Sequence, residues 1–297
     1  MTDWIECVPN FSEGRDPTVI DALADAVQSV DGAHLLDVHA DRAHHRSVFT
    51  VAGAVVPVCE AVFRATQVAA ETIDLTRHSG VHPRVGATDV VPLVPLEGVT
   101  LEDCVALARS LAARIARELD IPVFLYGHSA PRRLVDLRRG GVAALEAGLR
   151  VGSVPEPEYG PGSLHPTAGA TAVGARGFLV AYNVFLETSE KSVAQGVAAR
   201  VRASGGGLPG VQAMGFDVAG RAQVSMNLLD VDTTTPKHAY DAVARLAKDA
   251  GVEVSESEFV GLVPERAIEG LDGGELRLAT PLGEHLLEPK LRAARSA

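Results

Sequence analysis

The sequence contains few cysteines, few aromatic residues and an excess of acidic side chains. Its three cysteines, Cys7, Cys59 and Cys104, are an odd number at irregular spacing, which favours a reducing compartment over a disulfide framework. One tryptophan, four tyrosines and eight phenylalanines leave Ala, Val and Leu to build the core. The 27 basic against 38 acidic residues give a net charge of −11, which argues against a nucleic-acid partner.

The sequence also lacks long apolar runs. None approaches the roughly 18 residues of a membrane span, and the first arginine is Arg15, so there is no basic region of a secretory or transit peptide. We therefore expect a cytoplasmic protein without a membrane partner. A hydrophobic content of 46% over 297 residues indicates a globular chain of about two domains.

The first half alternates strand-like and helix-like segments. Asp16 and Pro17 cap and open an amphipathic helix over residues 19–30, and strand-like runs at 34–38 and 47–52 flank a polar turn. Thr100 and Asp103 form a capping box for another helix. Further expected elements are a strand at 4–9, a helix at 57–72, strands at 90–96 and 122–126, and a helix at 132–150.

The second half repeats this order. Strand-like runs at 178–183, 211–216, 221–228 and 257–263 alternate with helical patterns that end near residues 203 and 250. The order β-α-β-β-α-β describes a ferredoxin-like unit, whose sheet has one face bare of helices. We predict an α+β fold of two ferredoxin-like (βαββαβ-type) subdomains, covering residues 1–177 and 178–297.

A stretch rich in proline and glycine lies at residues 151–166. It marks either a domain boundary or a functional loop. Residues 160–169, which overlap the end of this stretch, offer backbone amides and small side chains to a flat ligand, although their composition equally suits a linker.

Ten histidines are present, and six of them fall between His34 and His82. One reading makes His39, Asp41, His44 and His45 metal ligands; the other makes them a polar hairpin turn, since adjacent histidines on an extended chain point to opposite faces. Pro83 removes residue 82 from helical geometry, so His82 lies in a loop beside Arg84, where it suits either proton transfer or simple exposure.

Nucleophile motifs are weak. Each cysteine falls on or near apolar positions of a predicted strand or helix, which favours a buried structural thiol. The sequence has no G-x-S-x-G elbow and no Walker A motif.

Several segments together resemble the formiminotransferase family. They are Glu6-Cys-Val-Pro-Asn10-Phe-Ser-Glu-Gly14, His82-Pro-Arg84-Val-Gly86-Ala-Thr-Asp89, Gly169-Ala-Thr-Ala-Val-Gly-Ala-Arg176-Gly-Phe-Leu-Val-Ala-Tyr-Asn183 and Gln223-Val-Ser-Met-Asn227-Leu-Leu-Asp230. The resemblance runs from residue 5 to about residue 270 and implies a homodimer with a folate tunnel between the two subdomains. It leads us to expect the stand-alone form, without a cyclodeaminase domain.

The resemblance implies transfer of a formimino group from N-formimino-L-glutamate to N5 of tetrahydrofolate, in histidine degradation and one-carbon metabolism. Tetrahydrofolate is then a co-substrate, and no metal is expected. The catalytic residue is His82, and the candidate substrate-binding residues are Asn10, Arg46, Arg84, Asn183 and Asn227. The folate-binding stretch is Gly160, Pro161, Gly162, Ser163, Leu164, His165, Pro166, Thr167, Ala168 and Gly169.

Three other functions stay open at this point. A family relative acting on 5-formyltetrahydrofolate, as a formyltransferase or cyclo-ligase, would use the same tunnel and histidine. A metal-dependent hydrolase would use His39, Asp41, His44 and His45. A non-catalytic ligand-binding module would keep the fold without the chemistry.

Overall fold

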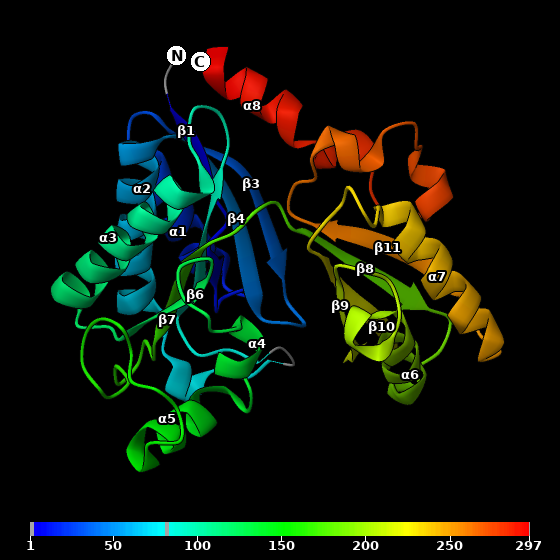
Figure 1. Cartoon of the computed structure of the whole chain (residues 1–297), viewed down its shortest axis with the longest axis horizontal. Helices are drawn as coiled ribbons and strands as arrows, with labels where there is room; N and C mark the ends of the chain where they lie inside the picture. Colours follow the sequence, from blue (N-terminus) through cyan, green and yellow to red (C-terminus); the bar gives the residue numbers. More distant parts are fainter. Residues whose placement is uncertain (1–2, 81–82, 297) are drawn as a thin grey trace. The chain divides into compact units, whose positions relative to one another are not determined.

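Two compact units make up the chain in the computed structural model, which describes residues 3–80 and 83–296 (Figure 1). The first unit spans residues 1–177 and the second spans residues 178–297. Each unit holds a β-sheet with helices packed against it, which confirms the α+β fold class. Residues 151–166 lie inside the first unit, which excludes the domain-boundary interpretation of this stretch.

The sheet of the first unit joins an antiparallel part to a parallel part. Strands β1 and β2 both pair with β4 and β5, so they form one line that is interrupted at Val8 and Pro9. Strand β3 pairs antiparallel with β4 on one side of this line, and β5 pairs antiparallel with the line on its other side. Strands β7 and then β6 continue the sheet in parallel to β5. The strand bounds are β1 Trp4–Cys7, β2 Asn10–Phe11, β3 Ala33–Asp41, β4 Arg46–Ala54, β5 Thr88–Pro95, β6 Val123–Gly127 and β7 Thr171–Ala175.

Helices α1 (Pro17–Gln28), α2 (Val55–Thr72) and α3 (Leu101–Leu119) pack side by side on one face of this sheet (Figure 1). Two of their N-termini are as predicted. The Asp16 side chain accepts from the N–H of Thr18, with Pro17 at the first helical position. Thr100 and Asp103 form the reciprocal capping box of α3. The core between helices and sheet is mainly aliphatic, as expected from the scarcity of aromatic residues, with Phe11, Phe49 and Phe63 among its members.

The prediction of a single helix at residues 132–150 was wrong. The structure has a short helix α4 (Leu134–Leu137) and a separate helix α5 (Gly141–Val151). Gly140 and Gly141 adopt φ values of 79° and 70°, a left-handed conformation that ends one helix before the next begins. Leu137 and Leu145 from these helices pack against Phe124 and Tyr126 of β6.

The second unit has the element order predicted from the sequence. Its sheet runs β11-β8-β10-β9, all antiparallel, with α6 between β8 and β9 and α7 between β10 and β11. Ala219 and Gly220 join β9 to β10 with φ values of 53° and 80°, the signature of a tight two-residue hairpin turn. The bounds are β8 Val180–Leu186, α6 Lys191–Val201, β9 Val211–Val218, β10 Arg221–Leu228, α7 Pro236–Asp249, β11 Val254–Val260 and α8 Leu287–Ser296.

Strand alternation gives the second sheet two different faces. Tyr182, Val224 and Met226 pack with α6 and α7 in the hydrophobic core, whereas Asn183 and Gln223 point to the opposite face. The sequence pattern predicts a strand that ends at Asn183. In the structure Asn183 lies in the middle of β8 instead.

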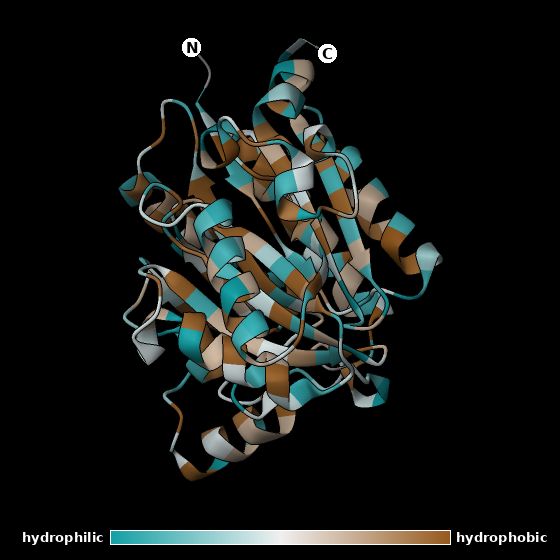
Figure 2. Cartoon of the chain, turned by 90° about the vertical axis from the view of Figure 1, so that its right-hand side faces the viewer, coloured by the Kyte–Doolittle hydropathy of each residue, from teal (hydrophilic) through white to brown (hydrophobic). Residues whose placement is uncertain are grey.

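Short 3-10 turns complete the secondary structure. They are η1 Leu75–Arg77, η2 Ala203–Gly205, η3 Glu265–Ile268, η4 Gly273–Leu276 and η5 Leu282–His285. Hydrophobic residues are interspersed with hydrophilic ones along the helices (Figure 2). Within residues 3–80 and 83–296, no helix is both long and apolar enough to cross a membrane.

Candidate active site

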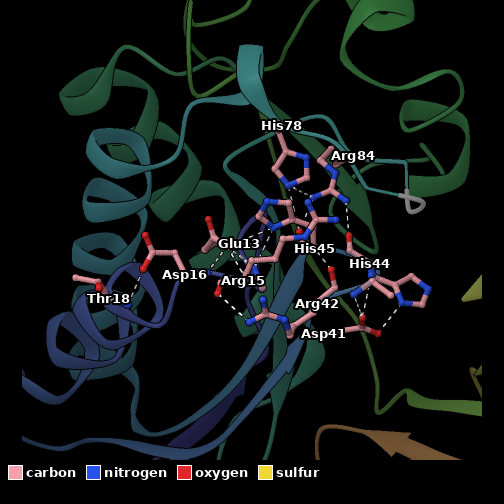
Figure 3. Close-up of polar contacts among 12 residues, drawn as sticks. Glu13, Arg15, Asp16, Thr18, Asp41, Arg42, His44, His45, His78 and Arg84 are labelled. Carbon is pink, nitrogen blue, oxygen red and sulfur yellow. Dashed lines mark hydrogen bonds and ion pairs between the residues drawn. The ribbon is translucent and has the colours of Figure 1, made fainter. Parts of the chain in front are cut away.

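Arg84 holds the turn between β3 and β4 (Figure 3). Its Nη1 donates to the carbonyl oxygen of His45 at 2.7 Å, and its Nη2 donates to that of His44 at 2.6 Å. The side chain is 8% exposed, and burial lowers the pKa of Arg84 to about 10. The guanidinium therefore remains charged at neutral pH and fixes two turn carbonyls at once. Its predicted contact with a substrate carboxylate stays a prediction.

The rings of His78 and His45 lie against each other beside this guanidinium, with centroids 4.1 Å apart and planes tilted by 30°. Nη1 of Arg84 lies 2.6 Å from Nε2 of His78. Because a guanidinium can only donate, Nε2 accepts in this contact; the same nitrogen also lies 3.2 Å from the carbonyl oxygen of His45, to which only the other tautomer could donate. Burial, reinforced by the charge of Arg84, lowers the pKa of His78 to about 4. His78 is thus a neutral imidazole at neutral pH, with Nε2 between Arg84 and the carbonyl oxygen of His45.

His45 has a left-handed backbone conformation, with φ at 50°. Its Nδ1 accepts from the N–H of Gly14 at 3.2 Å and lies 3.3 Å from Oε1 of Glu13. Burial lowers the pKa of His45, with Arg15 and Arg84 acting in the same direction and Glu13 opposing them. The turn is therefore connected to the segment that follows β2 as well as to Arg84.

Asp41 organises the other side of the turn. Its Oδ2 lies 2.6 Å from Nδ1 of His44, and its Oδ1 accepts from the backbone N–H groups of Ala43 and His44 at 2.8 Å each. Burial alone would raise the pKa of Asp41, but these hydrogen bonds outweigh it and lower the pKa to about 2.

The neighbouring histidines of the turn thus face different partners, His44 toward Asp41 and His45 toward Glu13 and His78. In the described ranges 3–80 and 83–296, no group of three or more His, Cys, Asp or Glu side chains is placed to hold a metal ion. The metal-ligand reading of His39, Asp41, His44 and His45 therefore has no support from the described residues.

A pocket of about 530 Å³ lies beside His78 and Arg84. It is lined by Leu75, His78, Ser79, Gly80, Pro83, Arg84, Gly140 and the first residues of α5, Gly141 to Ala143. No side chain of the described residues caps the N-terminus of α5. The first-turn N–H groups of such a helix favour an anionic group. Arg138, just before α5, forms a 2.5 Å ion pair with the buried Asp89 of β5 and ties this helix to the sheet.

The predicted folate-binding stretch at 160–169 lies directly beside the segment that carries His78 and Arg84. Two backbone hydrogen bonds join the two, Leu75 N–H to Thr167 O at 2.9 Å and Ala87 N–H to Ala168 O at 2.8 Å. A third, from Ala170 N–H to Val85 O at 2.8 Å, follows directly after the stretch. Gly169 has a φ of 70°, and a Cβ there would lie 2.3 Å from Val85 O. Only glycine fits this contact.

The other predicted site residues are dispersed over several strands. Arg46 begins β4 and contributes to the electrostatic environment of Arg84, while Asn10 of β2 donates to Val8 O at 3.0 Å. Asn183 and Asn227 lie on β8 and β10 of the second unit. His82 lies outside the described residues.

Sequence reasoning missed two parts of this site. One is the ring contact between His45 and His78, and the other is the ion pair between Asp89 and Arg138. Both join positions more than 30 residues apart, so local spacing carried no signal for them. The family-like segment from residue 82 to residue 89 contains Asp89 and was the one available indication.

Comparisons with known proteins give the family. Residues 4–176 match the formiminotransferase domain, N-terminal subdomain, and residues 181–275 match the formiminotransferase domain. Glutamate formimidoyltransferase of Streptococcus pyogenes serotype M1 is 42% identical, over 90% of this chain and 91% of that protein. Its namesake from Thermoplasma acidophilum is 40% identical, over 98% of both chains. Formimidoyltransferase-cyclodeaminase of Rattus norvegicus is 40% identical, over 90% of this chain and 51% of that protein. The chain belongs to the formiminotransferase family.

Proposed function

We propose that the protein transfers the formimino group of N-formimino-L-glutamate to N5 of tetrahydrofolate, giving 5-formiminotetrahydrofolate and L-glutamate. One observation carries this proposal: two relatives named glutamate formimidoyltransferase are 40–42% identical over at least nine-tenths of both chains. The reaction belongs to histidine degradation and one-carbon metabolism.

The chemistry needs a proton shuttle more than a protein nucleophile. N5 of the folate attacks the amidine carbon, a tetrahedral intermediate forms, and the C–N bond to glutamate breaks as that nitrogen takes up a proton. His82 moves this proton, a role worth about 10²–10⁴ in rate. Gly80 and Pro83, the described residues on either side of it in sequence, line the pocket beside His78, which supports the assignment.

A covalent intermediate on cysteine is disfavoured by the thiols themselves. Burial raises the pKa of Cys7 well above its usual value and raises those of Cys59 and Cys104 to about 11. Thiols with such pKa values carry almost no thiolate at neutral pH and are poor nucleophiles. The folate amine therefore acts directly, and this attack requires no metal.

The two anionic substrates would bind around the pocket. We assign the folate to residues 160–169, which accept backbone hydrogen bonds from Leu75 and Ala87 and so lie beside the pocket-lining segment. Asn10, Arg46, Arg84, Asn183 and Asn227 are the candidate substrate contacts. Since Arg84 also holds the β3–β4 turn, a carboxylate reaching it would meet a side chain whose orientation is already fixed.

The same proposal extends to the assembly and the cellular setting. We infer a homodimer of two-subdomain chains, acting in the cytoplasm on small molecules. The paucity of cysteine and the family membership support the setting.

A direct transfer assay tests the proposal. The protein is incubated with tetrahydrofolate and N-formimino-L-glutamate, and the folate product is followed by its absorbance. A parallel reaction supplies 5-formyltetrahydrofolate and L-glutamate. Turnover in the first reaction alone is the expected result. Absence of turnover in the first reaction would refute the assignment, and turnover in the second alone would identify a formyl-group enzyme.

A further inference from the structure

A polar cluster lies on the helix-free face of the second sheet. The strand register places Glu258 of β11 and Ser225 of β10 on either side of Asn183 of β8. Nδ2 of Asn183 donates to Oε1 of Glu258 at 2.9 Å, and Nε2 of Gln223 donates to the same oxygen at 3.4 Å. Two amide side chains thus converge on one carboxylate.

Gln223 is the unusual member of this cluster. Its exposed fraction is 0%, and its cross-strand neighbours on β8 and β9 are Phe185 and Phe216. Because Nε2 donates to Glu258, the orientation of the amide is fixed and Oε1 remains as an acceptor. This Oε1 is buried and has no hydrogen-bond partner among the described residues. Acceptors buried this deeply are nearly always paired in folded proteins.

The charge of Glu258 is also available to a ligand. Glu256, two residues earlier on the strand, is neutralised by Arg221 at 2.8 Å. Glu258 takes part in no ion pair within residues 3–80 and 83–296, and its recorded partners are the two neutral amides. The cluster therefore combines a carboxylate, whose Oε1 accepts from two neutral amides, with the buried carbonyl oxygen of Gln223, which has no donor among the described residues.

We infer that Glu258, Gln223 and Asn183 form a binding site for a planar group that presents paired N–H donors. A carboxylate accepts two parallel N–H bonds from such a group, and Oε1 of Gln223 accepts a further one. This inference rests on the proposed function, in which two substrate groups are planar and carry such paired N–H donors. One source is the amidine of the formimino group, and the other is the pterin edge, with its 2-amino group and ring N–H.

Binding measurements on two variants test this site. Glu258→Gln removes the charge while keeping the shape, and Gln223→Met removes the buried acceptor at nearly constant volume. Glu256→Gln is the matched control, on the same strand and the same face. Calorimetric titration gives the affinity for N-formimino-L-glutamate and, separately, for tetrahydrofolate. L-glutamate and 4-aminobenzoyl-L-glutamate serve as reference ligands that lack the amidine and the pterin.

Both variants should lower the affinity for one substrate by about tenfold or more, as expected when a charged or buried hydrogen-bond partner is lost. Their affinities for the reference ligands, and all affinities of the control variant, should stay as in the wild type. Weaker binding of N-formimino-L-glutamate assigns the amidine to the site, and weaker binding of tetrahydrofolate assigns the pterin to it. Wild-type affinity of both variants for both substrates overturns the inference.

The Gln223→Met protein also guards against a folding artefact. Removing an unpaired buried acceptor should leave its thermal midpoint at or above that of the wild type, so any loss of binding there is local. The wild-type transfer assay separates the two proposals. An inactive wild type refutes the proposed function, whereas an active wild type with unaffected variants refutes this site alone.

Discussion

Replacing His78 by glutamine should remove a specific part of the acid sensitivity of the first unit. In the folded protein the pKa of His78 is about 4, because burial and the adjacent Arg84 disfavour the imidazolium. In the unfolded chain it is about 6.5. The unfolded chain therefore binds more protons between these values, and the free energy of unfolding falls as the pH drops from 6.5 toward 4.

The size of the effect follows from the two pKa values. Each pH unit is worth about 1.4 kcal/mol, so full conversion would cost at most ~3.4 kcal/mol at pH 4. His78 is only partly buried, and solvent screening reduces this figure to about 1–2 kcal/mol. Glutamine does not titrate, and its Oε1 can accept from Arg84 as Nε2 does now.

Urea unfolding at pH 8, 6.5, 5.5 and 4.5 measures the effect. Trp4, the only tryptophan, lies in β1, so its fluorescence reports on the first unit. Wild type and His78→Gln should differ little in stability at pH 8, where both side chains are neutral. The variant should then gain about 1–2 kcal/mol relative to the wild type by pH 4.5. Parallel stability curves across this pH range would refute the reasoning.

Three further perturbations have definite outcomes. His82→Ala should lower the transfer rate by about 10²–10⁴ while tetrahydrofolate still binds in a titration, and unchanged turnover would rule out the catalytic role. Asp41→Asn should lower the free energy of unfolding in urea by about 1–2 kcal/mol at pH 7, because the low pKa of Asp41 stabilises the fold above pH 4. The difference between variant and wild type should vanish as the pH falls through 2. A difference in unfolding free energy that does not depend on pH would contradict this origin. Gly169→Ala should lower the free energy of unfolding by about 1–3 kcal/mol, seen as a lower thermal midpoint, because the new Cβ meets Val85 O at a positive φ. It should also weaken the binding of tetrahydrofolate. Gly177→Ala, outside the predicted folate-binding stretch and with nothing within 4 Å of a new Cβ, is its control, and equal behaviour of the two variants would argue against the strain.

Local signals predicted the regular elements well. The cap at Asp16 and Pro17 and the capping box at Thr100 and Asp103 specify helix starts through contacts within one turn, and both are present. The break before α5 escaped prediction because helical periodicity continues across it. There the left-handed conformation of Gly140 and Gly141 overrides the apolar pattern.

The candidate site depends on pairings that no local pattern encodes. Resemblance to a family pointed to Arg84 and to residues 160–169, but not to the carbonyls that Arg84 holds or to the ring contact between His45 and His78. Likewise, alternation along β10 placed Gln223 on the helix-free face, yet its burial depends on Phe185 and Phe216 of neighbouring strands. Such contacts arise only when strands distant in sequence come into register.

The hydrogen bonds between residues 85–87 and 168–170 have a consequence for how the first unit folds. Val85 and Ala170 are 85 residues apart in sequence, so a large loop must close before they meet. A nascent chain can complete the antiparallel part of the sheet, from β1 to β5, well before β7 is synthesised. Until then the outer edge of β5 has no parallel neighbour, and Val85 and Ala87 lack their backbone hydrogen-bond partners at residues 168–170. The pocket is therefore among the last parts of this unit to assemble, and an early terminated chain would keep the hairpins while losing the site.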